Sequence, residues 1–168
     1  MNTLLTFLVS TAAVAMPIMA QTLSAGSTVQ FGSNENPDLC LGAVYTYEYA
    51  QILLQPCGAP GTTFTLDNGI SSIATRLEVV YSGDEPLCVN AVDSQAGNTP
   101  VLLEVCADDL FERWYVEGGT GTGQIRSAVE TEDFCLTAAV DGQGDPVEYQ
   151  VCTGTPNQQW STYVIDEA

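Results

Sequence analysis

Apolar and polar residues alternate along short segments of the chain, and Gly, Asn, Asp and Pro separate these segments. Together with the frequency of Val, Leu, Tyr and Thr, this pattern is typical of short strands joined by tight turns. No window of about 12 residues shows a helical period, so the pattern predicts an all-β protein. Turn signals separate the segments at Asp67-Asn68-Gly69, Ser82-Gly83-Asp84, Gly118-Gly119 and Asp141-Gly142.

The N-terminal segment lacks this alternation. Leu4 to Ala15 is an unbroken run of apolar and small residues, too short to span a bilayer, and Pro17 precedes a suitable cleavage point after Ala20. We interpret residues 1–20 as a signal peptide and expect residues 21–168 to form one secreted domain. The alternative, an N-terminal core helix, is disfavoured because the run has no amphipathic period. No later segment is long and apolar enough for membrane insertion.

Six cysteines divide the predicted domain into three brackets of nearly equal length. Cys40 to Cys57 and Cys135 to Cys152 each span 17 residues, and Cys88 to Cys106 spans 18. In a secreted chain this even number of cysteines indicates disulfides, because the exterior is oxidising. Six cysteines allow 15 pairings, and the periodicity makes pairing within each bracket the most economical of them.

The residues around the cysteines repeat as well. Each opening cysteine lies between apolar residues, and an aromatic residue follows each closing cysteine after seven or eight positions, at Phe64, Trp114 and Trp160. A period of this length is the signature of a repeat architecture, in which single units cannot bury their own apolar faces. We predict three repeats sharing one core, at about 27–74, 75–122 and 123–168.

A closed sheet is the expected arrangement of these repeats, because closure leaves no exposed strand edge. The first strand, near Thr28 to Phe31, should then pair with the last strand, near Ser161 to Ile165.

At these landmarks the chain resembles the ricin B-chain-like lectins. In that family each unit has an opening Cys-Leu or Cys-Val, a closing Cys and then a Gln-x-Trp. Gln158-Gln159-Trp160 matches this closing motif, and the equivalent segments of the other units are Glu112-Arg113-Trp114 and Thr62-Thr63-Phe64. The resemblance covers essentially the whole predicted domain. It implies a β-trefoil of three pseudo-repeats, each with one disulfide within the repeat.

The resemblance also indicates where a sugar pocket would lie. In the family such a pocket uses an Asp two residues after the opening Cys, an aromatic two residues before the closing Cys and an Asn before the Gln-x-Trp. The carboxylate binds sugar hydroxyls, and the ring covers the apolar face of the sugar. Only Asn157 matches, because the Asp positions hold Gly42, Asn90 and Thr137 and the aromatic positions hold Gln55, Glu104 and Gln150.

No unit therefore has the complete pocket, although two units keep polar fragments. In the second unit, Asn90 and Asp93 occupy the opening turn. In the third unit, the candidate carbohydrate-binding residues are Asp141, Glu148, Tyr149, Asn157 and Gln158. Tyr149 would be the stacking ring; its alternative role is core packing, and that of Gln158 is a buried amide that satisfies loop backbone.

The first unit contains three tyrosines at alternate positions, Tyr45, Tyr47 and Tyr49. This spacing fits one face of a strand or loop. The rings are either plain sheet surface or a strip that stacks on sugars or binds a protein.

The charge of the chain narrows the range of partners. There are 21 Asp and Glu residues against three arginines, with no histidine, and the net charge is -18. Such a surface repels phosphate backbones and anionic lipids, so nucleic acids and membranes are poor partners. The acidity fits either solubility in an acidic exterior or attraction of a cationic partner or Ca²⁺.

Catalysis is not expected. Without histidine the available general acids and bases are mainly carboxylates, and no nucleophile, phosphate-binding or histidine-based zinc motif is present. We expect no metal and no cofactor. The leading hypothesis is a secreted, non-catalytic lectin-like protein that binds a glycan weakly at one or two degenerate sites. The alternative is a secreted β-trefoil that binds a cell-surface or secreted protein, such as a protease, and has lost sugar binding.

Overall fold

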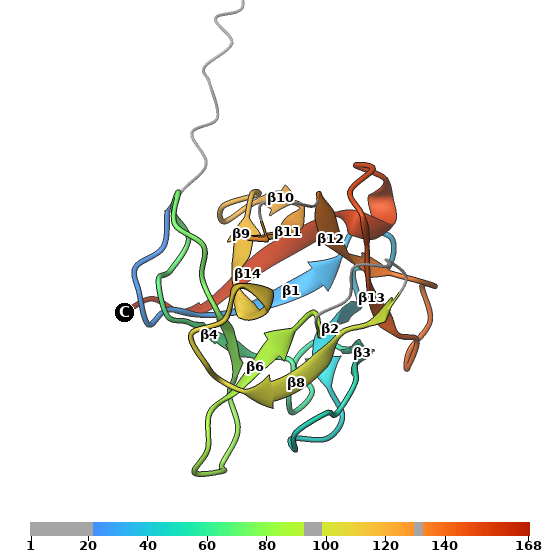
Figure 1. Cartoon of the computed structure of the whole chain (residues 1–168). Coiled ribbons are helices and arrows are strands. Elements are labelled where there is room, and N and C mark those ends of the chain that lie inside the picture. Colours follow the sequence, from blue (N-terminus) through green and yellow to red (C-terminus); the bar gives the residue numbers. More distant parts are fainter. Residues whose placement is uncertain (1–21, 93–98, 130–132) are drawn as a thin grey trace, which may run out of the picture.

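The computed structural model describes residues 22–92, 99–129 and 133–168, and it shows an all-β protein (Figure 1). The predicted signal peptide lies outside these residues. Within them, helical structure is confined to two 3₁₀ turns, η1 (Leu110–Glu112) and η2 (Pro156–Gln158). The all-β prediction is therefore confirmed.

The strands follow the repeats of the sequence. Those of the first unit are β1 (Thr28–Ser33), β2 (Leu39–Ala43), β3 (Ile52–Pro56) and β4 (Phe64–Leu66). Those of the second are β5 (Leu77–Val79), β6 (Leu87–Asn90), β7 (Thr99–Pro100), β8 (Leu102–Val105) and β9 (Trp114–Val116). Those around the third are β10 (Thr122–Gly123), β11 (Ile125–Ser127), β12 (Phe134–Ala138), β13 (Val147–Val151) and β14 (Trp160–Asp166).

The chain closes on itself through its first and last strands. β1 pairs with β14 in antiparallel register, with Val29 opposite Val164 and Gly32 opposite Ser161. β1 also pairs with β4, β4 with β5, and β9 with β11, while a bridge between Thr75 and Trp114 joins the β5 and β9 sides. The predicted closure is confirmed, and it leaves these strands without a long free edge.

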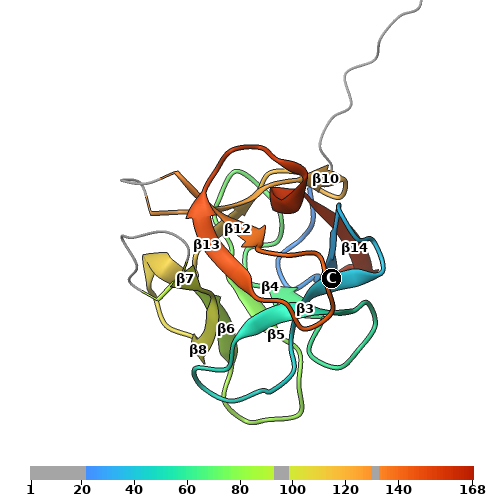
Figure 2. The ribbon, with the colours of Figure 1, turned by 90° about the vertical axis from the view of Figure 1, so that its right-hand side faces the viewer.

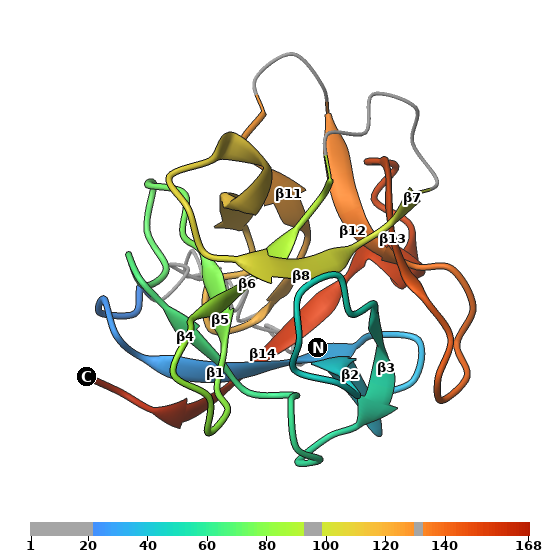
Figure 3. The same cartoon turned by 60° about the horizontal axis from the view of Figure 1, so that its bottom comes forward.

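Three hairpins cover one end of this closed sheet: β2–β3, β6–β8 and β12–β13 (Figure 3). They contact one another through bridges from Gln51 to Leu102 and from Leu53 to Pro146. In addition β13 pairs with β7, and the two strands lie side by side in Figure 2. Each hairpin thus packs against its neighbours, as expected for the β-trefoil.

All three predicted disulfides are present. Cys40 pairs with Cys57, Cys88 with Cys106 and Cys135 with Cys152, and no cysteine is free. In a chain-entropy model each closed loop of this length contributes about 3 kcal/mol to stability.

One core is shared by the three units. Its largest fully buried side chains are Phe31, Phe64, Trp114, Tyr149 and Trp160. The three aromatic residues that follow the closing cysteines are all among them. Their repetition along the sequence therefore reflects the fold.

The turn predicted at Asp67-Asn68-Gly69 is present, and glycine is required there. Gly69 has a φ of 64°, and a Cβ at this position would lie 2.1 Å from the carbonyl oxygen of Leu23. Only glycine combines this left-handed backbone with such close packing. The turn lies between β4 and β5, where the carboxylate of Asp67 accepts a hydrogen bond from the N–H of Arg76 (2.7 Å).

Candidate functional site

In the third unit the closing motif holds a loop. Gln158 is 2% exposed, and its Oε1 accepts hydrogen bonds from the backbone N–H groups of Thr153 (2.6 Å) and Gly154 (3.1 Å). Its Nε2 donates to the carbonyl of Val151 (2.8 Å) and to Oγ1 of Thr137 (3.0 Å). The amide is therefore occupied by loop backbone on both sides, and it is not exposed to a ligand.

In the second unit Glu112 stands at the position equivalent to Gln158, two residues before the buried tryptophan. Its Oε2 accepts a hydrogen bond from the N–H of Ala107 (2.7 Å), the residue after the closing cysteine, just as Thr153 is in the third unit. Burial raises the pKa of Glu112, while hydrogen bonds from Ala107 and Asn90 oppose this shift. A carboxyl thus replaces an amide in an otherwise equivalent contact.

In the first unit the equivalent residue is Thr62, which is fully buried. Its hydroxyl donates to the carbonyl of Ala59 (2.7 Å) and accepts from Nε2 of Gln30 (2.9 Å). The methyl group of Thr62 occupies space beside Gly42, where a Cβ would approach Cγ2 of Thr62 to 2.8 Å. Gly42 stands at the position of the family's pocket Asp, so packing alone leaves no room for that side chain.

Asn90, a candidate residue of the second unit, is buried at the end of β6. Asn90 is 3% exposed; its Nδ2 donates to Oε2 of Glu104 (2.9 Å) and its Oδ1 accepts from the N–H of Val92 (2.6 Å). Burial and the charges of nearby carboxylates, that of Glu112 foremost, raise the pKa of Glu104. Asp93 lies outside the described residues.

Tyr149 belongs to the core. It is fully buried on β13, where it stacks on Phe134 with ring centroids 4.7 Å apart and meets Trp114 edge-on at 6.1 Å. Val147 and Tyr149 share the inward face of β13, because alternate residues of a strand point to the same side. This placement corrects the expectation that Tyr149 stacks on a sugar.

The remaining third-unit candidates lie around the β12–β13 hairpin. Asn157 is half-buried, and its Nδ2 donates to the carbonyl of Ala138 (3.3 Å) at the end of β12. Asp141 is exposed in the turn of the hairpin, and half-buried Glu148 accepts a hydrogen bond from Gln150 (2.7 Å). Asn157 and Asp141 thus flank one hairpin, while Glu148 lies along β13.

The β2–β3 loop carries a prominent aromatic surface. Tyr45, Tyr47 and Tyr49 are 62%, 58% and 61% exposed, and the rings of Tyr45 and Tyr47 stack with centroids 5.6 Å apart. We call these three residues the tyrosine loop. The N–H of Tyr49 donates to the carbonyl of Leu103 (2.7 Å), which ties the loop to β8 of the second unit.

Tyr49 also has an unusual backbone. Its φ of 68° is left-handed, and among the described non-glycine residues only Val92 shares such a conformation. Non-glycine residues in this region are strained, and such strain is concentrated at functional sites. The neighbouring charge of Glu48 raises the pKa of Tyr49 further above its usual value.

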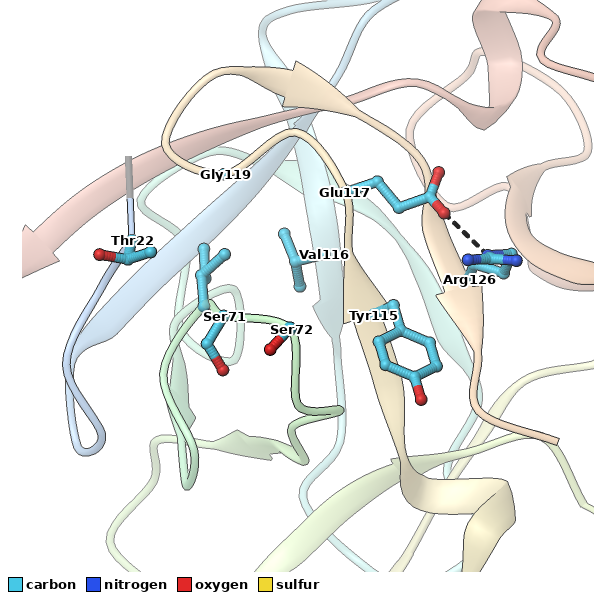
Figure 4. Close-up of a pocket in the computed structure, with 9 residues that line it drawn as sticks. Thr22, Ser71, Ser72, Tyr115, Val116, Glu117, Gly119 and Arg126 are labelled. Carbon is cyan, nitrogen blue, oxygen red and sulfur yellow. Dashed lines mark ion pairs between the residues drawn. The ribbon is translucent and has the colours of Figure 1, made fainter. Parts of the chain in front are cut away.

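Two hollows lie on the side of the closed sheet. One, of about 520 Å³, is lined by residues that include Ile70, Val116, Glu117 and Arg126 (Figure 4). The other, of about 700 Å³, is lined by residues that include Ile73, Leu110 and Arg113. Ser72 and Tyr115 line both, so the two hollows meet at these residues.

The positive charges of the chain gather around this region. Asp67 forms ion pairs with Arg76 and Arg113, both at 2.8 Å. Burial of Asp67 opposes its ionisation, but hydrogen bonds from Arg76 and Thr75 and the charge of Arg113 lower its pKa. The third arginine, Arg126, pairs with Glu117 at 2.8 Å.

Sequence reasoning did not identify the hollows around Tyr115. Their lining comes from the β4–β5 turn and from β9 and β11, which are separated by tens of residues in the sequence. One signal was available: Tyr115 follows the buried Trp114 on a strand, so its ring must face outward.

Metal and membrane features are both absent from the part of the chain that the structure describes. Those residues form no group of three or more potential metal-ligating side chains. Nor do they include a helix of the length and apolarity needed to cross a membrane.

The closed sheet, the three capping hairpins and the equivalent closing motifs define a β-trefoil. The sequence profile of the ricin-type β-trefoil lectin domain matches residues 76–167, more than half of the chain. The chain therefore belongs to this family. No curated protein sequence matches the chain.

Solved structures agree on the fold. ThreeFoil, a designed threefold-symmetric protein, has a TM-score of 0.69 and 15% identity, covering 81% of this chain and 97% of that one. The β-trefoil lectin of the Vibrio vulnificus hemolysin/cytolysin, solved with N-acetyl-D-lactosamine bound, has a TM-score of 0.62 and 17% identity, covering 86% of this chain and 98% of that one. The Polyporus squamosus lectin, solved with an influenza-binding epitope, has a TM-score of 0.67 and 10% identity. The match covers 83% of this chain and 49% of that one, so this chain spans about half of that lectin.

Proposed function

We propose that this protein is a secreted, non-catalytic glycan-binding protein. The observation that carries the proposal is an exposed aromatic surface, the tyrosine loop, on a member of a lectin family. An aromatic ring with a free face covers the apolar C–H face of a sugar, and its hydroxyl bonds to sugar hydroxyls. Two of the structural neighbours are themselves lectins with saccharides bound, which supports the same class of ligand.

We place the main contact at the tyrosine loop and a second, weaker contact at the β12–β13 hairpin. At the hairpin, Asn157 and Asp141 flank the turn, and Glu148 lies along β13. The family's pocket positions in the first two units are Gly42 and a buried, fully engaged Asn90, which support no binding there. With so few anchors we expect a dissociation constant of about 1 mM, or roughly 4 kcal/mol.

Secretion is supported by the three disulfides and by the apolar N-terminal run. Such bonds persist in oxidising surroundings and are rare in the cytosol. The absence of catalysis is supported by the lack of histidine and by the engagement of the two carboxyls with raised pKa. Glu104 accepts a hydrogen bond from Asn90, and Glu112 accepts one from Ala107.

A second function, protein binding, is favoured by one observation. Val44, which adjoins the tyrosine loop, is 48% exposed, so the aromatic surface continues into an aliphatic one. Exposed apolar side chains in a patch are typical of protein interfaces. A panel of secreted proteases tests this alternative, and inhibition without any glycan binding would favour it over the lectin function.

The glycan proposal is tested by comparing variants on a glycan array. We expect the protein to bind, Tyr45→Ala/Tyr47→Ala to lose most of the signal and Asn157→Ala to lose a smaller part. Tyr163→Ala is the matched control, because Tyr163 is a 38% exposed tyrosine on β14, away from both contacts. Failure of the wild-type protein to bind any glycan would contradict the function, and full binding by the double variant would contradict the site.

A further inference from the structure

Tyr115 is held at the centre of the two hollows. It lies on β9 directly opposite Arg126 on β11, and the guanidinium of Arg126 is 5.7 Å from the centroid of its ring. A cation over an aromatic face is an attractive contact, so the ring is fixed in place. Figure 4 shows Tyr115 and Arg126 side by side, with Ser72 across the hollow from the ring.

The first hollow offers hydrogen-bonding groups of both kinds. The ion pair between Arg126 and Glu117 (2.8 Å) puts donors beside acceptors at its rim, and Ser72 adds a hydroxyl. Neighbouring hydroxyls of a pyranose ring require this combination, because each hydroxyl both donates and accepts. The volume of about 520 Å³ is within the usual range for a small-molecule site.

The charges inside the hollows are paired, so neither hollow offers a free charge to an ionic ligand. Arg126 and Glu117 balance one another in the first hollow, and Arg113 and Asp108 do so in the second. Elsewhere the chain carries a large excess of carboxylates, since its net charge is -18. A neutral ligand therefore fits this region best.

Half of the residues that line the second hollow are aliphatic. Ile73 and Leu110 are 64% and 57% exposed, and Ala74, Ala128 and Val129 complete the aliphatic part of the lining. Small apolar groups gain free energy by leaving water for such a surface. A sugar whose ring lies in the first hollow would thus place an apolar substituent in the second.

We propose that the hollows around Tyr115 form one binding site for a neutral sugar with an N-acetyl group. The ring hydroxyls bind Arg126, Glu117 and Ser72, Tyr115 borders both parts, and the acetyl methyl group packs on Ile73 and Leu110. The inference rests on the proposed glycan-binding function for its ligand class. Its location is separate, because none of these residues belongs to the tyrosine loop or to the β12–β13 hairpin.

The test uses three trisaccharides that share a β-1,4 backbone and differ only at carbon 2: chitotriose, cellotriose and the fully deacetylated glucosamine trimer. Titration calorimetry with the purified protein should show tightest binding to chitotriose. Cellotriose should bind about fourfold more weakly, the factor for one methyl group that is not buried. Equal affinity for chitotriose and cellotriose, or tighter binding of the charged trimer, would overturn the proposal.

Variants locate the site. Tyr115→Ala should weaken chitotriose binding at least tenfold. Ile73→Ser should remove the preference for chitotriose over cellotriose without changing the melting temperature, because Ile73 is exposed. The matched control is Ile165→Ser, which changes another exposed isoleucine, on β14.

Chitotriose binding that both Tyr115→Ala and Ile73→Ser leave at the wild-type level would contradict the site. The double variant Tyr45→Ala/Tyr47→Ala separates this inference from the proposed function. If that variant loses array binding while chitotriose fails to bind the wild-type protein, the function stands and the inference fails. If no glycan of any kind binds, both fail.

Discussion

The second and third units hold the same loop with different chemical groups. In the third unit the amide of Gln158 accepts from the N–H of Thr153 and donates to the carbonyl of Val151. In the second unit Glu112 accepts from the N–H of Ala107, but an ionised carboxylate has no proton to donate. The donor there is instead Asn90, which contacts both Glu104 and Glu112.

This difference shows that the polar positions of the motif serve the loops. In the third unit Gln158 donates a hydrogen bond to the hydroxyl of Thr137. In the second unit Glu112 has no proton to donate, and it accepts a hydrogen bond from the amide of Asn90 instead. Asn90 and Thr137 stand at the position that the family uses for its pocket Asp. Loop packing, rather than sugar, therefore accounts for the residues at this position.

The largest expected effect is on Gln158. Gln158→Ala leaves the N–H groups of Thr153 and Gly154 and the carbonyl of Val151 without their side-chain partner, which should cost about 3 kcal/mol of unfolding free energy. Denaturant unfolding monitored by tryptophan fluorescence measures this loss. The control is Gln159→Ala, since Gln159 makes one long contact with Gly154 (3.4 Å) and should matter little. Equal losses in the two variants would contradict the loop-holding role.

The buried tryptophans provide the next comparison. Nε1 of Trp114 donates to the carbonyl of Val89 (2.9 Å), and Nε1 of Trp160 donates equivalently to that of Leu136 (3.0 Å). Trp114→Phe, which copies the Phe64 of the first unit, should cost about 2.5 kcal/mol through a lost hydrogen bond and a small cavity. Calorimetric melting of Trp114→Phe and Trp160→Phe should give similar losses, and a neutral result for either would break the equivalence of the units.

In the first unit a prediction comes from adding a group instead of removing one. Gly42→Ala brings a methyl group within 2.8 Å of Cγ2 of Thr62 and should cost about 2 kcal/mol by overpacking. Adding Thr62→Ser removes that methyl group and should recover part of the loss. A double-mutant cycle measures the coupling, and strict additivity would show that these positions are independent.

The smallest effect, of opposite sign, is expected for Glu112. Burial raises the folded-state pKa of this carboxyl, so its contribution to stability is present below its unfolded pKa of about 4.3 and lost as the pH rises through the folded value. Glu112→Gln should therefore raise the melting temperature slightly at pH 7, because a neutral amide avoids the cost of ionising a buried group. Melting temperatures should converge near pH 4, and a constant difference across this range would contradict the prediction.

The sequence allowed the fold to be predicted because its determinants repeat. Cys40, Cys88 and Cys135 open brackets of nearly equal length, and the pairing of β1 with β14 follows from the need for closure. The buried cysteines and aromatic residues recur in all three units, so a comparison of the units along the sequence identifies the core positions.

The site was less predictable, because it depends on which face each residue presents. Tyr149 alternates with polar neighbours, and only the packing of β13 on Phe134 and Trp114 shows that it faces the core. The role of Asp67 as partner of two arginines depends on segments joined by the fold, since Arg113 lies 46 positions further along the chain. The hollows around Tyr115 could not be inferred for the same reason.

The most direct measurement is an NMR titration of the protein with a glycan that the array identifies. The account predicts that ring signals of Tyr45, Tyr47 and Tyr49 shift with glycan concentration. The side-chain amide signals of Asn90 and Gln158 should stay unchanged, because loop backbone and carboxyl groups already occupy them. Shifts of those two amides with unchanged tyrosine signals would place the sugar in the family's pocket positions and contradict the account.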